Sequence, residues 1–415
     1  MASLEGIECR EYRHEDAEGS LQLHDSRWRA IPPDFWHRWS HRPDVTASVA
    51  LMDGRVVGQI PFHIREFLVR PGVTVRAAQE HSVIVAEEMR SRGVGSALMI
   101  EAERFLAGRC EVMMVYRGGE RTPGYRFYQR TGHHDLAYHR LWTQGGETPA
   151  ASRVEDPERS QRAVECTDVG TMLDRESEVL DIFQSAYLPY GGAGAPPRRK
   201  GYWKEALGSV IFCEAPGDFR WLYLEDAGRL LAYALCLEGR GERGGASVLE
   251  LATRDGQAEP AVVLLRHAAH RAEEKGLTLT IRKPDRSVYA AALRQAGYVP
   301  APRAERSMMT MARIFDPAAL AQRVLAQTGL SLPVEVAVWT PERQAVLNPG
   351  DGSGRRLTLE MKECDLARLL LCRMDLLRAV TEERVTVVGT GPGDLEAVAE
   401  VFAFSSWDYH ALDYI

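Results

Sequence analysis

The 415-residue chain contains little cysteine and no long hydrophobic run. Its seven cysteines are scattered and never form a Cys-x-x-Cys pair, which argues against a disulfide framework and a cysteine-based metal site. No run of about 18 apolar residues occurs, so we expect no membrane-spanning helix and no membrane partner. The first residues also lack the basic and apolar regions of a signal peptide. These absences together predict a cytoplasmic protein with reduced, buried thiols.

An excess of positive charge is missing as well. The formal net charge is −7, from 51 Lys and Arg against 58 Asp and Glu. Binding to nucleic acid depends on neutralising phosphates, so we expect no nucleic-acid partner. Hydrophobic residues at 45% and charged residues at 26% are typical of a globular protein. A chain of this length exceeds one ordinary core and predicts two or three domains.

The most informative motif follows a predicted strand formed by Val83, Ile84 and Val85. It has the form Arg-x-x-Gly-x-Gly, and a long amphipathic helix is predicted directly after it, through about Gly108. The residues of the motif are Arg90, Ser91, Arg92, Gly93, Val94, Gly95 and Ser96. A strand, a glycine turn and a helix start in this order present free backbone N–H groups to a pyrophosphate.

Related phosphate-binding motifs do not fit this stretch. A dinucleotide-binding loop needs Gly-x-Gly-x-x-Gly, and a P-loop needs Gly-Lys followed by Ser or Thr. Neither pattern is present, because Ser96 follows Gly95 without a lysine. An ordinary helix N-terminus with two turn glycines is the alternative. Arg90 and Arg92 favour the phosphate-binding interpretation, since they supply cationic partners.

A second motif lies some 30 residues further on. The stretch Phe127-Tyr128-Gln129-Arg130-Thr131-Gly132 places a phenol near the same cleft, and Tyr125 is a rival phenol close by.

The sequence of residues 1–143 predicts one domain with a β-hairpin around Asp53-Gly54, followed by alternating strands and helices. This order is α+β with mixed strand pairing.

The rest of the chain divides into three further parts. Residues 144–161 are polar and rich in turn formers, which predicts a linker. Residues 162–312 repeat the first part in outline, but their phosphate loop carries Asp255 and Glu259. Each carboxylate would repel a pyrophosphate by an amount on the order of 1 kcal/mol, so we interpret this copy as degenerate. Residues 313–415 predict a separate α/β domain without a metal or nucleophile constellation.

Two such halves followed by about 100 residues resemble the enhanced-intracellular-survival (Eis) family of GNAT N-acetyltransferases. The resemblance rests on Val83–Ala97, on residues 127–132 and on the aromatic-rich tail at residues 402–415. It implies tandem GNAT folds and a C-terminal sterol-carrier-protein-like domain. It also implies acetyl-CoA as co-substrate and a homohexamer.

The resemblance further implies a role for each part of the site. The strand at Val83 and Val85 would pair with the pantetheine arm, and the amides of Arg92 to Ser96 would hold the pyrophosphate. Tyr128 would be the general acid toward the leaving thiolate. The C-terminal carboxylate of Ile415 would reach the active site of the first domain as the general base. The last residue is aliphatic here, where we expect an aromatic one, so the pocket shape beside it differs.

The chemistry needs a base, because an amine attacks a thioester only when neutral and its pKa is about 8–10. An α-carboxyl group has a pKa around 3.5 and is a weak base unless burial raises it. Glu80, His81 or a water relay are therefore alternatives to Ile415. We expect no metal, since His133-His134 lack a third ligand at suitable spacing.

Four residues are candidates for the acceptor pocket: Asp25, Trp28, Trp36 and Glu80. The tryptophans could attract a cation but could equally pack in the core. Asp25 and Asp408 would suit an acidic substrate channel but could instead be solvated surface acids. The predicted function is acetyl transfer to a primary amine that is aminoglycoside-like, polyamine-like or a protein lysine. Two alternatives stay open: a non-catalytic acyl-CoA or lipid-binding module, and a tandem-GNAT acyltransferase of a cysteinyl thiol metabolite.

Overall fold

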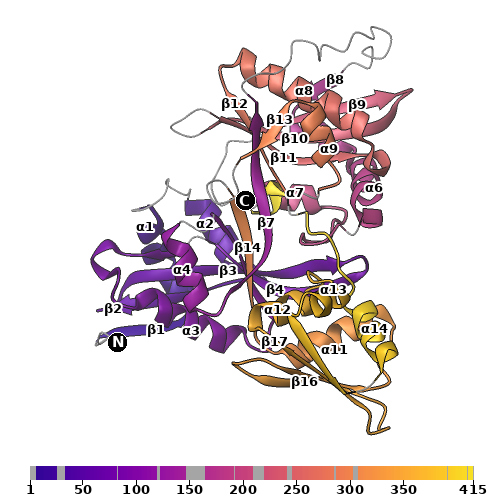
Figure 1. Ribbon diagram of the computed structural model, residues 1–415. Helices are drawn as coiled ribbons and strands as arrows, with labels where there is room; N and C mark the ends of the chain where they lie inside the picture. The colour runs from indigo at the N-terminus through magenta and orange to yellow at the C-terminus, as the bar shows by residue number, and fades with distance from the viewer. Residues whose placement is uncertain are drawn as a thin grey trace. The chain divides into compact units, whose positions relative to one another are not determined.

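The computed structural model arranges the chain in two compact units (Figure 1). The first unit combines residues 1–117, 122–137 and 309–405, and the second combines residues 118–121, 138–308 and 406–415. Each unit is described by itself. The structure describes residues 6–25, 33–81, 83–118, 122–145, 164–190, 192–208, 219–240, 245–284, 287–301, 307–389, 391–408 and 410–414.

The first unit contains a mixed sheet in the order β1-β2-β3-β4-β6-β14, with the short β5 paired to β3. Its strands are β1 (Ile7–Glu11), β2 (Val45–Met52), β3 (Arg55–Arg70), β4 (Val73–Glu80), β5 (Ile84–Val85), β6 (Val112–Gly118) and β14 (Ser307–Ile314). Its helices before residue 131 are α1 (Ala17–Asp25), α2 (Pro33–Ser40), α3 (Val94–Leu106) and α4 (Pro123–Arg130).

Two local predictions for this sheet are confirmed. β2 and β3 form an antiparallel hairpin in which Met52 pairs with Arg55. Asp53 and Gly54 at its turn both have positive φ, 51° and 75°, as a two-residue hairpin turn requires. α3 buries one stripe of apolar residues against the sheet. Gly58 on β3 allows this close approach, since a Cβ there would lie 3.0 Å from a methyl carbon of Leu98.

The C-terminal part of the first unit forms a separate four-stranded sheet in the order β16-β15-β17-β18. Its strands are β15 (Glu335–Trp339), β16 (Gln344–Pro349), β17 (Arg356–Met361) and β18 (Val385–Gly389). Its helices are α11 (Pro317–Thr328), α12 (Glu363–Leu370), α13 (Leu376–Thr381) and α14 (Pro392–Val401). Arg323 on α11 forms ion pairs with Glu66 of β3, at 2.7 Å, and with Glu111, at 3.0 Å. α11 is thereby held against the N-terminal sheet.

The start of α11 offers a test of local stability. Oδ1 of Asp316 accepts hydrogen bonds from the N–H groups of Ala318 and Ala319 at 2.9 and 3.0 Å. We expect Asp316→Ala to lower the free energy of unfolding by about 1 kcal/mol, because two helix N–H groups lose their partner. Urea unfolding followed by circular dichroism measures this. Asp316→Asn keeps a capping oxygen, so an equal loss in that variant would contradict the capping role.

The second unit contains a sheet in the order β7-β12-β11-β10-β9-β8, with β13 paired to β7. Its strands are β7 (His134–Gln144, of which residues from Tyr138 onward belong to this unit), β8 (Val164–Thr167), β9 (Phe219–Asp226), β10 (Arg229–Arg240), β11 (Gly245–Thr253), β12 (Thr278–Lys283) and β13 (Tyr298–Pro300). Its helices are α5 (Val169–Asp174), α6 (Glu176–Tyr187), α7 (Tyr202–Gly208), α8 (Ala258–Glu274) and α9 (Ala290–Gln295). Trp142, Trp203, Trp221 and Tyr233 are fully buried in its core.

The turn between β11 and α8 stands where the second phosphate loop was predicted. Asp255 adopts a left-handed φ of 52°, and its N–H donates to Ser185 Oγ at 3.1 Å. Glu259 lies in the first turn of α8. A carboxylate at this position neutralises the positive helix end that would otherwise attract an anion. The turn therefore keeps the strand–turn–helix outline but has the wrong charge for a pyrophosphate.

The α+β prediction, with a separate sheet near the C-terminus, is confirmed. The two compact units cut the chain differently from the predicted boundaries: residues 309–405 group with the N-terminal part, and residues 406–415 with the middle part. The predicted linker lies outside the described residues from position 146 onward. Among the helices described, none is long and apolar enough to cross a membrane.

Candidate active site

In the first unit, one edge of the strand at the predicted pantetheine site faces away from β3. β4 and β6 pair in parallel up to Glu80 and Val115. The chain after Glu80 continues along β3 instead: His81 N–H donates to Pro61 O at 2.9 Å, and Ala86 N–H to Val57 O at 2.8 Å. Bonds to one neighbour alternate along an antiparallel strand, so the amide of Val85 points to the opposite edge. That edge is where a thioester carbonyl or an amide of a ligand could bond.

The glycine loop follows this edge directly. Arg90 Nε donates to Val85 O at 3.2 Å, and Ser91 and Gly93 have φ values of 62° and 92°. Gly93 is the N-cap of α3. Neither a side-chain cap nor an acidic first-turn residue occurs at this end of α3, whose residues are all described. Its first N–H groups are therefore available to an anion, and the positive end of the helix favours one.

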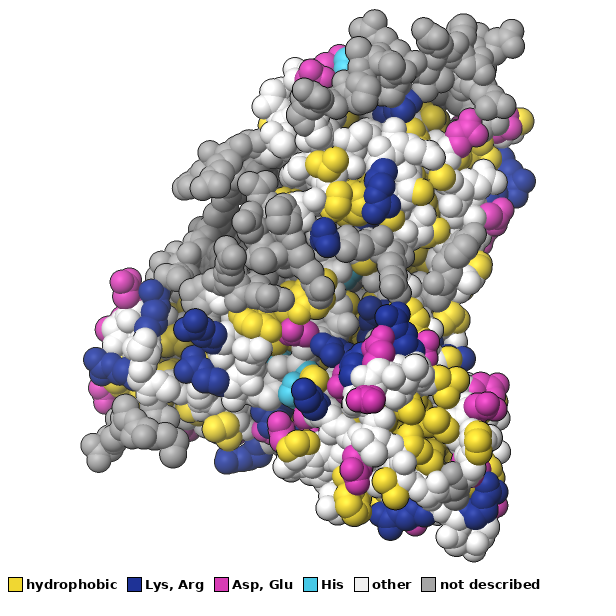
Figure 2. Space-filling view, in the orientation of Figure 1, with side chains coloured by type: hydrophobic (Ala, Val, Ile, Leu, Met, Phe, Trp, Pro, Cys, Tyr) yellow, Lys and Arg dark blue, Asp and Glu magenta, His cyan; other side chains and the backbone are white. Residues whose placement is uncertain are grey.

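Basic side chains surround this end of α3. Figure 2 shows Lys and Arg side chains in dark blue over the face that carries α3 and α4, where Arg90, Arg92, Arg126 and Arg130 are exposed. The chain as a whole is acidic, whereas these four exposed side chains are basic. They suit a ligand with several phosphates.

The two sequence motifs meet at one contact. A Cβ added to Gly95 would lie 3.2 Å from a ring carbon of Phe127, the residue before Tyr128 on α4. The glycine thus lets the tyrosine-bearing helix pack directly on the first turn of α3. Gly95 and Phe127 are 32 positions apart in the sequence and are neighbours in the structure. The sequence predicts that the two motifs lie at one cleft.

Of the two phenols on α4, Tyr128 and Tyr125 have different surroundings. Tyr128 is 8% exposed, and its ring stands edge-on to the rings of Phe127 and His133, with centroids 5.1 and 5.2 Å apart. Tyr125 donates its hydroxyl hydrogen to Asp135 Oδ2 at 2.9 Å. A carboxylate partner holds the proton of Tyr125, which makes Tyr125 the poorer donor toward a ligand.

A buried dyad lies next to Tyr128. His133 Nε2 is 2.7 Å from Glu80 Oε1, and His133 Nδ1 is 3.1 Å from the hydroxyl of Thr131. Both side chains of the dyad are fully buried. Glu80 Oε2 is also buried, and among the described residues it has no hydrogen-bond partner. Sequence reasoning named Glu80 but missed its link to His133, because 53 positions separate them.

His81 lies on the other side of the same strand end, beside His63 and Trp39, at ring separations of 6.5 and 6.3 Å. Burial lowers the pKa of His81 well below its usual value, so this imidazole is neutral near pH 7. A neutral imidazole can accept a proton, but its burial makes it a weak base.

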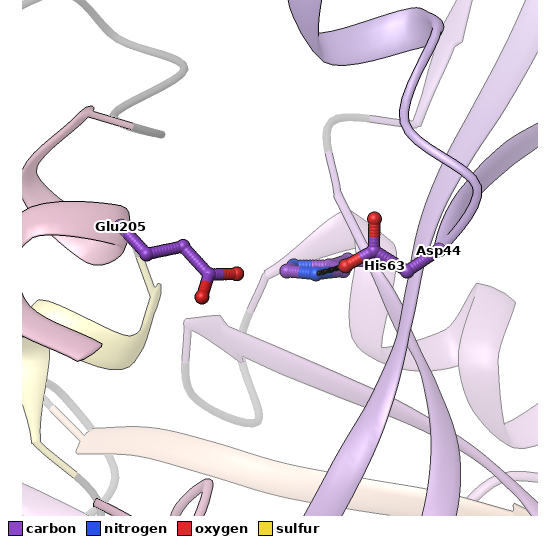
Figure 3. A group of neighbouring side chains, drawn as sticks. All are labelled: Asp44, His63 and Glu205. Atoms are coloured by element: carbon purple, nitrogen blue, oxygen red, sulfur yellow. Dashed lines mark hydrogen bonds and ion pairs between the residues drawn. The ribbon is translucent and has the colours of Figure 1, made fainter. Parts of the chain in front are cut away.

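His63 has a carboxylate partner. Figure 3 shows its ring facing Asp44, with Nε2 2.8 Å from Oδ2. Burial lowers the pKa of His63 although Asp44 opposes this. Burial would raise the pKa of Asp44, but hydrogen bonds from His63 and Arg42 hold it well below its usual range. Glu205, also drawn in Figure 3, belongs to the second unit and is not counted in this group.

The other predicted pocket residues are only partly described. Trp36 is 2% exposed and packs on Trp39 at a ring separation of 5.4 Å, so it lies in the core in this structure. Asp25 is the last residue of α1, and its side chain is outside the described residues. Trp28 and Ile415 also lie outside them.

The structure bears on two further interpretations of the sequence. Asp408, considered as a surface or channel acid, is buried in the second unit and paired with Lys283, so the surface interpretation is wrong. His134 lies near Glu342 and Glu363, with ligand atoms within 4.8 Å of one another. Glu363 already bonds to Arg343 at 2.7 Å and to Thr340 at 2.8 Å. We therefore assign no metal to this group.

Comparisons with known proteins agree with this geometry. Residues 7–133 match the model of the acetyltransferase (GNAT) family. No curated protein sequence matches the chain. Among solved structures, a GCN5-related N-acetyltransferase from Kribbella flavida is 16% identical, with 100% of both chains covered and a TM-score of 0.63. A probable N-acyltransferase from Enterococcus faecalis V583 is 13% identical, with 100% of both chains covered and a TM-score of 0.65.

Eis1 from Mycobacterium abscessus is 14% identical, with 98% of this chain and 100% of Eis1 covered and a TM-score of 0.58. At these identities the solved structures establish the fold alone. Members of the GNAT family use acetyl-CoA. Residues 7–133 are thus similar to the GNAT acetyltransferases, and 98% of the chain shares the fold of Eis1.

Proposed function

We propose that this protein is a GNAT acetyltransferase that transfers the acetyl group of acetyl-CoA directly to a primary amine in a ternary complex. The acceptor is an aminoglycoside-like or polyamine-like molecule or a protein lysine. The observation that carries the proposal is the contact of Gly95 with Phe127, which joins the phosphate-binding helix end to the helix of Tyr128. CoA carries a pyrophosphate, which the start of α3 would bind, and a thioester, whose leaving sulfur would take a proton from the phenol on α4.

The co-substrate is held by backbone groups in this proposal. The N–H groups of Arg92 to Ser96 bind the pyrophosphate, and the exposed edge at Val83 and Val85 pairs with the pantetheine arm. The N–H of Val85 then donates to the thioester carbonyl and stabilises the negative charge that develops on its oxygen. Ile84 is buried and anchors the strand.

Tyr128 is the general acid. The leaving thiolate, with a pKa of about 8.5 by analogy with cysteine, needs a proton, and a phenol with a pKa near 10 is matched to supply it. The Tyr128 ring is held by Phe127 and His133. Fixed orientation of the donor is worth several orders of magnitude in such a reaction.

The carboxylate of Ile415 is the proposed general base that removes the proton from the attacking amine. Its rival is Glu80, which bonds to His133 and whose buried Oε2 has no hydrogen-bond partner among the described residues. Either carboxylate must come within hydrogen-bond reach of the amine, directly or through one water.

The deciding experiment compares CoA release with a panel of amines for the native chain and for a chain extended by several residues after Ile415. We expect roughly 10²-fold lower turnover in the extended form with unchanged acetyl-CoA binding, because the base is displaced. Equal turnover in both forms would reject Ile415 and favour Glu80. Tight CoA binding without turnover on any amine would favour the non-catalytic module instead.

A homohexamer is part of the proposal by its resemblance to the Eis family. Sedimentation velocity at low micromolar protein concentration tests it, and a single monomeric species would reject it.

A further inference from the structure

The second unit encloses the C-terminal tail, residues 406–414. Ala193 N–H donates to Ser406 O at 3.2 Å, and Asp408 N–H donates to Ala193 O at 3.0 Å. The tail thus pairs with the backbone on both sides of Trp407, which is fully buried. A Cβ at Gly194, whose φ is 82°, would lie 2.8 Å from the Trp407 ring, so only glycine fits there.

One anchor of the tail is a buried ion pair at Asp408. Lys283 Nζ of β12 lies 2.8 Å from Asp408 Oδ1, and the Ser287 hydroxyl donates to Oδ2 at 2.5 Å. Lys283 also donates to the hydroxyl of Tyr187 at 3.1 Å. Among the charged groups described, the carboxylate of the tail is the one that neutralises this buried ammonium ion.

A second anchor lies at Asp413. Arg198 Nη1 donates to Asp413 Oδ1 at 2.7 Å, and Arg198 Nη2 donates to Glu250 Oε2 at 2.5 Å. The Tyr202 hydroxyl also donates to Asp413. Glu250 accepts further bonds from Trp203 Nε1 at 2.6 Å and the Tyr233 hydroxyl at 2.7 Å. Leu412 joins the apolar core between the two anchors.

These contacts explain why the second unit keeps charged side chains in its interior. A buried charge is costly unless it is paired and hydrogen-bonded. Lys283 and Arg198 each find a tail carboxylate, although 125 and 215 positions separate the partners. The interior of this unit is therefore complementary to the tail, as a binding site is to its ligand.

We propose that the second unit is a dock for the C-terminal tail and that Arg198 and Lys283 are positioning residues. Asp413 lies two residues before Ile415 in the sequence, and two residues of chain span at most about 7 Å. The dock thereby lowers the entropy lost when the carboxylate meets the amine. This part rests on the proposed base role of Ile415. The second unit, whose loop with Asp255 and Glu259 is unsuited to phosphate, thus has a function other than binding the co-substrate.

The test weakens the anchor at Asp413 in the full-length protein and leaves Ile415 in place. Asp413→Ala removes the carboxylate, while Arg198 keeps Glu250 as its partner, so no uncompensated positive charge is created. Asp413→Asn keeps the shape and one accepting oxygen. Asp174→Ala, an exposed acid of the same unit, is the matched control. Hydrogen exchange of the backbone amides at residues 407–414, acetyl-CoA affinity and kcat are measured for each variant.

For Asp413→Ala we expect tail amides to exchange about 10-fold faster or more, because the opening of the tail becomes easier. We also expect kcat to fall about 10-fold with unchanged acetyl-CoA affinity, since a misplaced catalytic group is costly. Asp413→Asn should recover part of both losses, and Asp174→Ala should match the native chain.

The outcomes separate the dock from the proposed reaction. Unchanged tail exchange in Asp413→Ala would overturn the dock. Faster tail exchange with native kcat would keep the dock but reject the base role of Ile415. Faster exchange throughout the second unit, shared by Asp413→Asn, would show that the anchor serves general folding and would overturn the positioning role.

Discussion

Tyr128→Phe is expected to lower kcat by roughly 10²-fold or more, because the leaving thiolate loses its proton donor. The affinity for acetyl-CoA should stay unchanged, since the hydroxyl takes no part in holding the pyrophosphate. The ring contacts with Phe127 and His133 survive the substitution, so the fold should be preserved. Steady-state kinetics and calorimetric titration with acetyl-CoA measure the two quantities.

Tyr125→Phe is the control for this prediction, because its hydroxyl bonds to Asp135. It should retain most of the native kcat. A native kcat in Tyr128→Phe would remove Tyr128 from the mechanism, and a large loss in Tyr125→Phe alone would transfer the acid role to Tyr125.

Gly95→Val is expected to weaken acetyl-CoA binding by roughly 10²-fold, comparable to the loss of one or two hydrogen bonds to a charged group. Its Cβ would meet the Phe127 ring at 3.2 Å, and its branched methyl groups would crowd the first turn of α3. The pyrophosphate could then not approach the backbone closely. Calorimetric titration with acetyl-CoA and with CoA gives the affinity.

Valine also lowers helix propensity, so a control must separate this effect from the blocked site. Arg104→Val places the same side chain at an exposed position of α3. It should bind acetyl-CoA with native affinity. Similar weakening in both variants would mean that helix stability, and not access to the loop, sets the affinity.

Both predictions depend on features that the sequence carries locally. The hairpin at Asp53-Gly54, the helix after Gly93 and the acids in the second loop are recognisable because turn chemistry and helical periodicity act over a few residues. The structure agrees with each of them. The sequence pattern also predicts helices over residues 316–328 and 394–402, and the bounds of α11 and α14 differ from these ranges by only one or two residues.

Contacts between distant parts of the chain could not be predicted from the sequence. β14, for example, lies beside β6 although nearly 200 positions separate them, and no local pattern marks such a pairing. Trp36 could line a pocket or fill the core, and its spacing allowed both. Packing against Trp39 decides for the core, because an aromatic stripe looks the same in either role until its neighbours are known.

The sequence by itself determined local features: a glycine turn at the start of a helix and a following phenol in the first unit, and a turn with the wrong charge for phosphates in the second unit. Tertiary structure decided which groups meet. It brought Glu80 to His133, Gly95 to Phe127 and Asp413 to Arg198. The physical reason is that hydrogen-bonded turns and helices are short-range, whereas a buried charge finds its partner only after the whole chain has closed around it.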